Sequence, residues 1–211
     1  MRENTRETNF MKKKLQTVVL TIFVIVVIAF LAITGINDLT NKDDLYTVRI
    51  DAGAEILAVE HSINGLIPIG TDHYYWAINE ETMESYVILA SKNWGNDTFD
   101  EDGYTINSKG TEITGLAKKI TDHDILSEIT DVLDQVDEGI ELTYPAGRTS
   151  SLDLNYKKNA YMRLVSAALI LILSIVGVVY RNKVDEINPK LTKIYLVVLI
   201  VTMILMIVAI R

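Results

Sequence analysis

The sequence predicts an α+β protein that is anchored in a membrane by three transmembrane helices. Three apolar blocks, residues 15–36, 160–180 and 194–210, carry most of the hydrophobicity of the chain. At about 1.5 Å per residue, each block forms a helix about 25–33 Å long, close to the hydrocarbon thickness of about 30 Å. The segment between the first two blocks, residues 37–159, is polar, acidic and rich in strand-forming residues. We expect a small mixed α+β domain there, with a barrel-like sheet as one alternative.

The first block, residues 15–36, follows the basic run Lys12–Lys14. A basic stretch before an apolar run is also typical of a cleavable signal peptide, whose apolar region has about 7–15 residues. This block is longer, so we predict an uncleaved signal anchor, with a two-span mature protein as the alternative.

The charges next to the apolar blocks predict the topology. Residues 1–14 and the loop 181–193 are rich in Lys and Arg, which favours the cytoplasm for both. Segment 37–159 then lies outside the cell membrane, and it holds 24 Asp and Glu against 9 Lys and Arg, a net charge of −15. We therefore predict a multi-pass membrane protein with a cytoplasmic N-terminus and an extracytoplasmic domain.

Strand-forming residues recur along this domain. Strands are predicted at 45–51, 55–60, 73–78, 86–90 and 111–120. The polar residues 79–85 predict a hairpin between the third and fourth of them. Pro68 indicates that residues 65–70 form an edge or connecting segment, and Gly115 predicts a bulge in the last strand.

One amphipathic helix follows, and two further strands come after it. Apolar residues recur with helical spacing at Ile125, Ile129, Val132, Leu133 and Val136. Asp122 is the expected N-cap and Gly139 the expected stop. Alternating apolar residues predict strands around 140–144 and 152–156, whereas residues 91–110 predict a long loop or a small excursion. The domain should hold five to seven strands and one main helix.

Aromatic residues in the middle of the domain are the candidates for partner binding. Alternation along a strand should place Tyr74 and Trp76 on one face and Tyr75 on the other. Trp94 and Phe99 lie in a polar stretch, so we propose them as partner-binding residues. The alternative is that they fix the loop to the domain.

Nothing in the sequence indicates a cofactor or a resident metal. His61, His73 and His123 are the only histidines, and no two have the spacing of a zinc site, so we expect surface or helix-cap positions. Residues 96–103 resemble a calcium loop in composition. Thr98 and Lys109 fall where an EF-hand needs acidic ligands, which excludes that motif and leaves a looser calcium site open.

The motifs of common enzymes are missing from the sequence. The chain has no cysteine and contains no G-x-S-x-G, H-E-x-x-H or P-loop pattern. Carboxylate pairs such as Glu80/Glu81 and Asp100/Asp102 are expected by chance in so acidic a segment. The net charge of −8 argues against nucleic-acid binding. We therefore expect a protein that is not an enzyme.

The second apolar block carries a stripe of small residues. Ser166, Ser174 and Gly177 fall on one helix face together with Ile170, which permits close helix approach. This face either packs against the third span or docks onto another membrane protein. The middle of each block lacks ionisable residues, so a transport path is not expected.

The layout of one N-terminal span, an outer domain and a C-terminal helical hairpin resembles small uncharacterised membrane proteins of Gram-positive bacteria. The resemblance also rests on the residue pattern of segments 65–90 and 111–120. It implies no activity and no site residues. We expect a membrane-anchored module whose outer domain binds a partner protein or an envelope component. The alternatives are an accessory subunit of a transport or secretion complex, assembled through the three spans, and an extracellular ligand or metal sensor.

Overall fold

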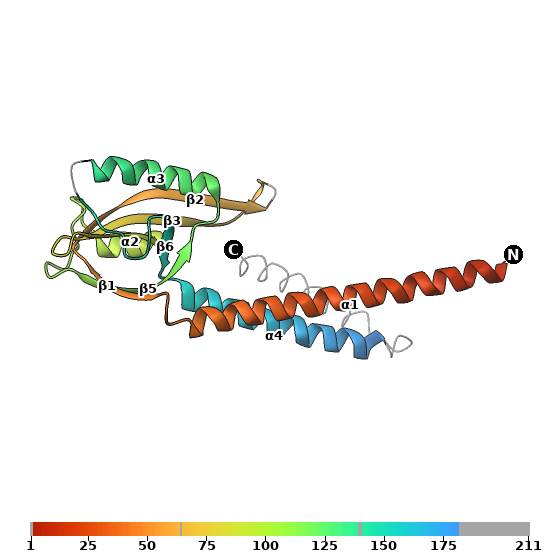
Figure 1. Ribbon diagram of the computed structural model, residues 1–211. Helices are drawn as coiled ribbons and strands as arrows, with labels where there is room; N and C mark the ends of the chain where they lie inside the picture. Colours follow the sequence, from red (N-terminus) through yellow and green to blue (C-terminus); the bar gives the residue numbers. More distant parts are fainter. Residues whose placement is uncertain (1, 64, 139–140, 182–211) are drawn as a thin grey trace. The chain divides into compact units, whose positions relative to one another are not determined.

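The computed structural model describes residues 2–63, 65–138 and 141–181. It confirms a mixed α+β protein with two compact units (Figure 1). One unit comprises Met1–Leu39 with Lys158–Arg211, and its described residues are helical; the other comprises Thr40–Lys157 and contains a sheet. The second unit lies within the segment 37–159 of the sequence.

The sheet unit is built on six strands. They are β1 (Leu45–Ile50), β2 (Ala52–Ile63), β3 (Ile67–Asn79), β4 (Glu84–Ala90), β5 (Thr111–Lys119) and β6 (Ser150–Asp153). Their order in the sheet is β1-β5-β6-β4-β3-β2, and only the β4–β6 pair is parallel. The sheet is open, with β1 and β2 at its edges, so the barrel-like alternative is wrong.

Asp51 joins the two edge strands, although they lie at opposite ends of the strand order. Its backbone N–H donates to the carbonyl of Ile78 in β3 at 2.8 Å, and its carbonyl accepts from the N–H of Thr105 at 2.9 Å. The chain therefore turns from one edge of the sheet to the other at a single residue. This brings the two edges together at one corner and requires the sheet to curve.

One face of the sheet is covered by α3 (His123–Asp137). The Asp122 carboxylate accepts from the N–H groups of Asp124 and Ile125, which satisfies the first turn as an N-cap does. Ile129 and Leu133 are fully buried and pack with Tyr74 and Val87 of the sheet. The predicted helix is confirmed, and its stability comes from this apolar stripe.

The opposite face packs against α2 (Lys92–Thr98), which lies in the segment predicted as a loop or excursion. Tyr75 belongs to the buried cluster on this face, whereas Tyr74 and Trp76 belong to the cluster beneath α3. The alternation predicted for this strand is confirmed. Ser91 caps α2, since its hydroxyl accepts from the N–H of Trp94 at 3.2 Å.

Three local predictions are wrong. Residues 141–144 form no strand and contribute only an isolated bridge between Thr143 and Glu84. Tyr156, expected at the end of a strand, begins a helix. Gly115 is no bulge, because β1 and β5 pair in continuous register through it. Glycine is needed at this position because an added Cβ would lie 2.9 Å from the Cβ of Leu152 in β6.

Pro68 lies inside β3 and not in a connection. It pairs with Ser62 at the point where the register of β2 and β3 shifts. A proline cannot donate to a regular ladder, so this irregular position near the start of the strand tolerates it.

The helical unit contains α1 (Arg2–Thr40) and α4 (Tyr156–Arg181). Each is long and apolar enough to cross a membrane by length and composition, over Thr21–Thr40 and Tyr156–Gly177. The predicted third span, residues 194–210, and nearly all of the loop 181–193 lie outside the described residues.

Helices α1 and α4 meet at a buried ion pair. Arg163 Nη1 donates to Asp38 Oδ2 at 2.7 Å, and the two side chains are 13% and 11% exposed. A Cβ added to Gly35 would lie 3.0 Å from the carbonyl oxygen of Ala160, so glycine permits the close approach. Of the predicted packing stripe, Ser166 is buried, whereas Ser174 and Gly177 are half-buried and the Ser174 hydroxyl donates to the Ile170 carbonyl at 2.7 Å.

Candidate functional site

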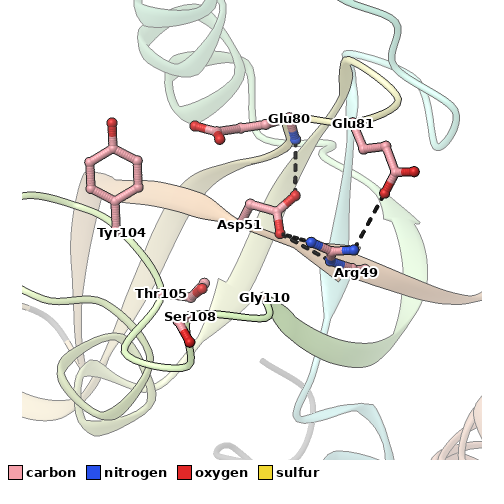
Figure 2. Close-up of a pocket in the computed structure, with 8 residues that line it drawn as sticks. All are labelled: Arg49, Asp51, Glu80, Glu81, Tyr104, Thr105, Ser108 and Gly110. Atoms are coloured by element: carbon pink, nitrogen blue, oxygen red, sulfur yellow. Dashed lines mark hydrogen bonds and ion pairs between the residues drawn. The ribbon is translucent and has the colours of Figure 1, made fainter.

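An open pocket with a volume of about 440 Å³ lies at the corner of the sheet unit where β1 passes into β2 (Figure 2). Three separate segments contribute to it: the β1–β2 corner, the turn between β3 and β4, and the loop before β5. The lining residues are Arg49, Asp51, Glu80, Glu81, Tyr104, Thr105, Ser108 and Gly110.

An ion pair between Arg49 and Asp51 forms the centre of the pocket. The Nε and Nη2 atoms of Arg49 donate to Asp51 Oδ1 at 3.0 and 2.8 Å, and Nη1 donates to Glu81 Oε2 at 3.4 Å (Figure 2). The Arg49 side chain is 47% exposed and that of Asp51 is 14% exposed. Asp51 therefore fixes a guanidinium whose remaining N–H groups are open to solvent.

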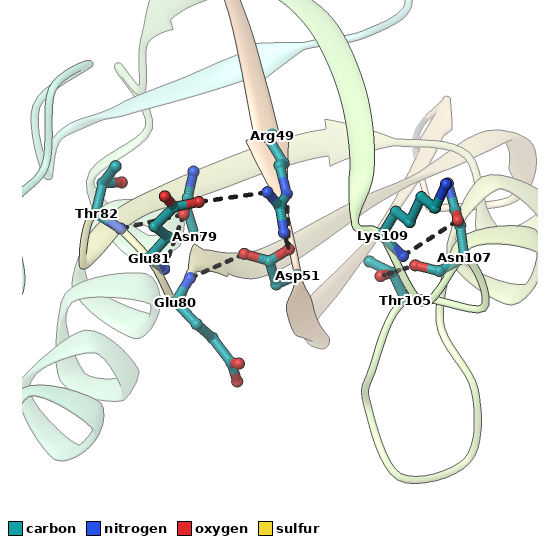
Figure 3. Close-up of polar contacts among 9 residues, drawn as sticks. All are labelled: Arg49, Asp51, Asn79, Glu80, Glu81, Thr82, Thr105, Asn107 and Lys109. Carbon is teal, nitrogen blue, oxygen red and sulfur yellow. Dashed lines mark hydrogen bonds and ion pairs between the residues drawn. The ribbon is translucent and has the colours of Figure 1, made fainter.

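The β3–β4 turn is tied to the same carboxylate. The N–H of Glu80 donates to Asp51 Oδ2 at 3.1 Å, so both oxygens of this carboxylate are engaged. Asn79 shapes the turn, because its side-chain oxygen accepts from the N–H groups of Glu81 and Thr82 (Figure 3). The positions of the two glutamates are thus set by backbone contacts.

The loop before β5 closes the other side of the pocket. The Thr105 hydroxyl donates to the Asn107 carbonyl at 2.9 Å, and the Asn107 side chain accepts from the N–H of Lys109 at 3.3 Å (Figure 3). Gly110 has a φ of +78°, and a Cβ there would collide with the Arg49–Asp51 pair. Glycine is required at this position for its conformation and for the contact.

The pocket combines one guanidinium, three carboxylates and two exposed residues that carry hydroxyl groups, Tyr104 and Ser108. Such a set can donate hydrogen bonds to a polar or anionic group and accept them from a cationic one. None of the described residues that line it is a histidine. The arrangement is suited to binding.

The predicted partner-binding residues Trp94 and Phe99 lie elsewhere, on α2 and just after it. Their rings meet at 5.6 Å and 90°, and Trp94 meets Tyr75 at 5.2 Å and 73°. Both are half-buried and pack against the sheet cluster. Burial, and secondarily the charge of Glu55, raise the pKa of Tyr75 to about 12. This packing favours the alternative that the two aromatics fix the segment, and partner binding by them stays a prediction.

The histidines occupy three different environments. His73 is buried, and its Nδ1 lies 2.9 Å from Glu55 Oε1, so the surface position predicted for it is wrong. His61 Nε2 lies 2.9 Å from Asp72 Oδ2, and His123 is exposed at the start of α3. Within the described ranges, no three His, Asp or Glu side chains gather as a metal site would require.

In the segment 96–103, the Asp100 carboxylate accepts hydrogen bonds from the backbone of the residues that follow it. Its Oδ1 accepts from the N–H groups of Asp102 and Tyr104 at 3.0 and 2.9 Å. The looser calcium site that the sequence left open stays untested.

The sequence did not identify the pocket as a site. Its residues are far apart in the chain, as Arg49, Glu81 and Ser108 show. The sequence marks Glu80 and Glu81 only as a carboxylate pair. A usable signal was the Asp51–Ala52–Gly53 break between two strand-like segments, which marks the corner. The chain matches no protein-family model, no curated protein and no solved structure.

Proposed function

We propose that this chain is a non-enzymatic, membrane-anchored protein whose outer domain, residues 37–159, binds a partner protein or an envelope component. The anchoring is supported by the exposed apolar side chains of α1 and α4, the helices that precede and follow the sheet unit in the chain. In α1 and α4 these side chains include Ile22, Phe23, Phe30, Ile33, Val165, Ile172 and Ile175. Burying one such side chain is worth about 1.5–3 kcal/mol, so lipid is the natural environment for so many.

The proposal includes three spans, a cytoplasmic N-terminus at residues 1–14 and a cytoplasmic loop at 181–193. The Lys and Arg residues of these two regions support it, together with the strongly acidic charge of the segment between the spans.

Intact-cell labelling tests this topology, because the natural chain has no cysteine. A single cysteine at Asn96, which is exposed on α2, should react with a membrane-impermeant maleimide before lysis. A matched cysteine at Lys12 should react only after lysis. Labelling of the Lys12 position in intact cells, or of the Asn96 position only in lysates, would overturn the topology.

We further propose that the pocket at the β1–β2 corner is the surface that binds. Tyr104 is 54% exposed, and Arg49 is held by Asp51 with part of its guanidinium in solvent. A side chain that is already fixed loses little conformational entropy on binding, which favours this surface over flexible charged ones.

Photo-crosslinking in intact cells tests the pocket. A photoreactive amino acid at Tyr104 should capture one discrete partner, and Arg49→Ala should abolish this capture. Glu128→Ala, on the exposed face of α3, is the matched control and should leave it unchanged. Capture that survives Arg49→Ala would show that the pocket does not bind the partner.

An accessory subunit of a transport or secretion complex is the second candidate. The exposed apolar residues of α4, among them Tyr161, Val165 and Ile172, support it because another membrane protein would cover them. Ser174→Leu or Gly177→Leu should then break assembly while the tryptophan fluorescence of the sheet unit stays unchanged. Unaltered co-purification of the complex would count against this candidate.

A further inference from the structure

Strands β2 and β3 continue beyond the rest of the sheet as a two-stranded arm (Figure 1). The last residue of β3 that pairs with β4 is His73, opposite Ala90. From Ile67 to Asp72, β3 pairs only with β2. This arm, residues 59–72, ends at the turn between the two strands.

The outer part of the arm has no charge. Residues 62–71 contain no Asp, Glu, Lys or Arg, in a segment where 24 acidic and 9 basic residues occur among residues 37–159. The last ionisable side chains before the tip are His61 and Asp72, whose Nε2 and Oδ2 atoms lie 2.9 Å apart across the two strands. The arm therefore divides into a polar base and an uncharged end.

The end of the arm exposes apolar side chains. Leu66 is 84% exposed, the highest value among the large hydrophobic residues described, and Pro68 is also exposed. Gly65 has a φ of +70°, and nothing lies within 4 Å of the position of its absent Cβ. We call the described residues Gly65–Ile69 the apolar tip.

We infer that the apolar tip inserts into the headgroup region of the bilayer in which the chain is anchored. This inference rests on the anchoring proposed above. Both ends of the sheet unit continue into apolar helices, so the chain itself holds the sheet unit at a high effective concentration of lipid surface.

The uncharged part of the arm is long enough to reach into the headgroup region. Five residues of β3 separate Asp72 from the turn and two residues of β2 separate His61 from it, which is about 16 Å and about 7 Å at about 3.3 Å per residue. The headgroup region on one side of a bilayer is about 5–8 Å thick. The tip can therefore enter the headgroup region while the side chains of His61 and Asp72 stay in water.

Charge and hydrogen bonding favour a lipid surface and limit how deeply the tip enters. The segment 37–159 carries a net charge of −15, so anionic lipids repel most of its surface and the uncharged arm is the part that can approach. Backbone N–H and C=O groups are costly in hydrocarbon unless they are hydrogen-bonded, and a two-stranded ribbon pairs only the groups between its two strands. Insertion should thus be shallow.

Depth-dependent quenching in nanodiscs tests the inference with the full chain. Single cysteines at Leu66, at Asn96 on α2 and at Val26 in α1 carry the same environment-sensitive dye. We expect the Leu66 dye to shift to the blue and to lose intensity with lipids spin-labelled near the headgroup, whereas the Asn96 dye does neither. Pro68→Asp should reverse the effect at Leu66, and Asn93→Asp, an exposed control, should not.

The Val26 dye lies inside the proposed first span and is therefore tested with lipids spin-labelled deep in the acyl chain. It separates this inference from the proposed anchoring. Quenching at Val26 without quenching at Leu66 would overturn the inference and leave the anchoring in place. An unquenched Val26 dye would overturn both. A blue shift at Leu66 without quenching by lipid would assign the tip to a protein surface, such as a second copy of the chain, and would also overturn the inference.

Discussion

Two arginine–aspartate pairs, one in each unit, share their chemistry and differ in their surroundings. Arg163 and Asp38 join α1 to α4 at 2.7 Å, with both side chains almost completely buried. Arg49 and Asp51 meet at 2.8 Å at the corner of the sheet, where nearly half of the arginine faces solvent. Water screens the second pair but not the first, so the cost of breaking them should differ greatly. The buried pair fixes two helices to each other, and the half-exposed pair presents a guanidinium to solvent.

The largest effect should follow from breaking the buried pair on one side only. Arg163→Ala leaves the Asp38 carboxylate buried without its partner, which costs about 3–5 kcal/mol. Separation of α1 and α4 can be measured by titration with a denaturing detergent, followed by energy transfer between dyes at Ile33 and Ile172, which are both exposed. The double variant Asp38→Leu/Arg163→Leu should restore most of the loss. A loss as large in the double variant would show that packing, not charge, dominates this contact.

The second largest effect is expected from removing the Asp51 carboxylate, because it accepts three hydrogen bonds from Arg49 and Glu80. Asp51→Ala should lower the free energy of unfolding of the sheet unit by about 2 kcal/mol. Both tryptophans of the chain, Trp76 and Trp94, lie in this unit, so their fluorescence in urea reports on it alone. An unchanged urea midpoint would show that the corner is held by its backbone bonds.

Alkaline pH should have an intermediate effect, through tyrosines that burial keeps protonated. The pKa of Tyr75 is raised to about 12 by burial and by the charge of Glu55, and that of Tyr144 to about 12 by burial and by its bond to Asp137. Between pH 10 and 12 the unfolded chain loses these protons and the folded chain keeps them. Stability is therefore complete below pH 10 and falls as the pH rises, by on the order of 1 kcal/mol per pH unit for buried Tyr75.

Tyr75→Phe checks this assignment. Urea titrations at pH 9 and pH 11 should show a smaller difference in this variant than in the natural chain. Equal differences would assign the alkaline loss to other groups.

The smallest effect is expected at the exposed end of the half-exposed pair. Glu81 is 77% exposed and lies 3.4 Å from Arg49, so Glu81→Gln should change the free energy of unfolding by less than about 0.5 kcal/mol. The same urea titration measures it. A loss comparable to that of Asp51→Ala would mean that the pocket is more shielded from water than its exposure indicates.

Periodicity predicted the elements whose burial repeats along the chain. The stripe from Ile125 to Val136 predicted α3, and alternation around Tyr75 predicted the faces of β3, because in both cases a buried side recurs at fixed spacing. Helix α2 was missed because its seven residues are mostly polar, and the Ser91 cap and the packing of Trp94 hold it in place. Gly115 was misread because its constraint comes from Leu152, far along the chain.

The pocket could not be predicted for a related reason. Its geometry depends on the turn at Asp51, which brings Glu81 and Ser108 to one place from distant parts of the chain. Local patterns carry no information about such a meeting. The apolar tip was visible in the sequence as the uncharged run around Pro68, but only the pairing of β2 with β3 shows that it lies at the end of an arm.

The strand order has a consequence for how the sheet forms. Strands β2, β3 and β4 are consecutive in the chain and adjacent in the sheet, so their pairing closes only short loops. Strand β6 pairs with β4 across the whole segment that contains β5 and α3. Strand β1 pairs with β5 across more than sixty residues, for example Leu45 with Leu116. Because closing long loops slows folding, the meander of β2 to β4 should form first. The contact of Thr105 with Asp51 then forms later than the contacts of Asp51 with Ile78 and Glu80, so the loop before β5 is the last side of the pocket to form.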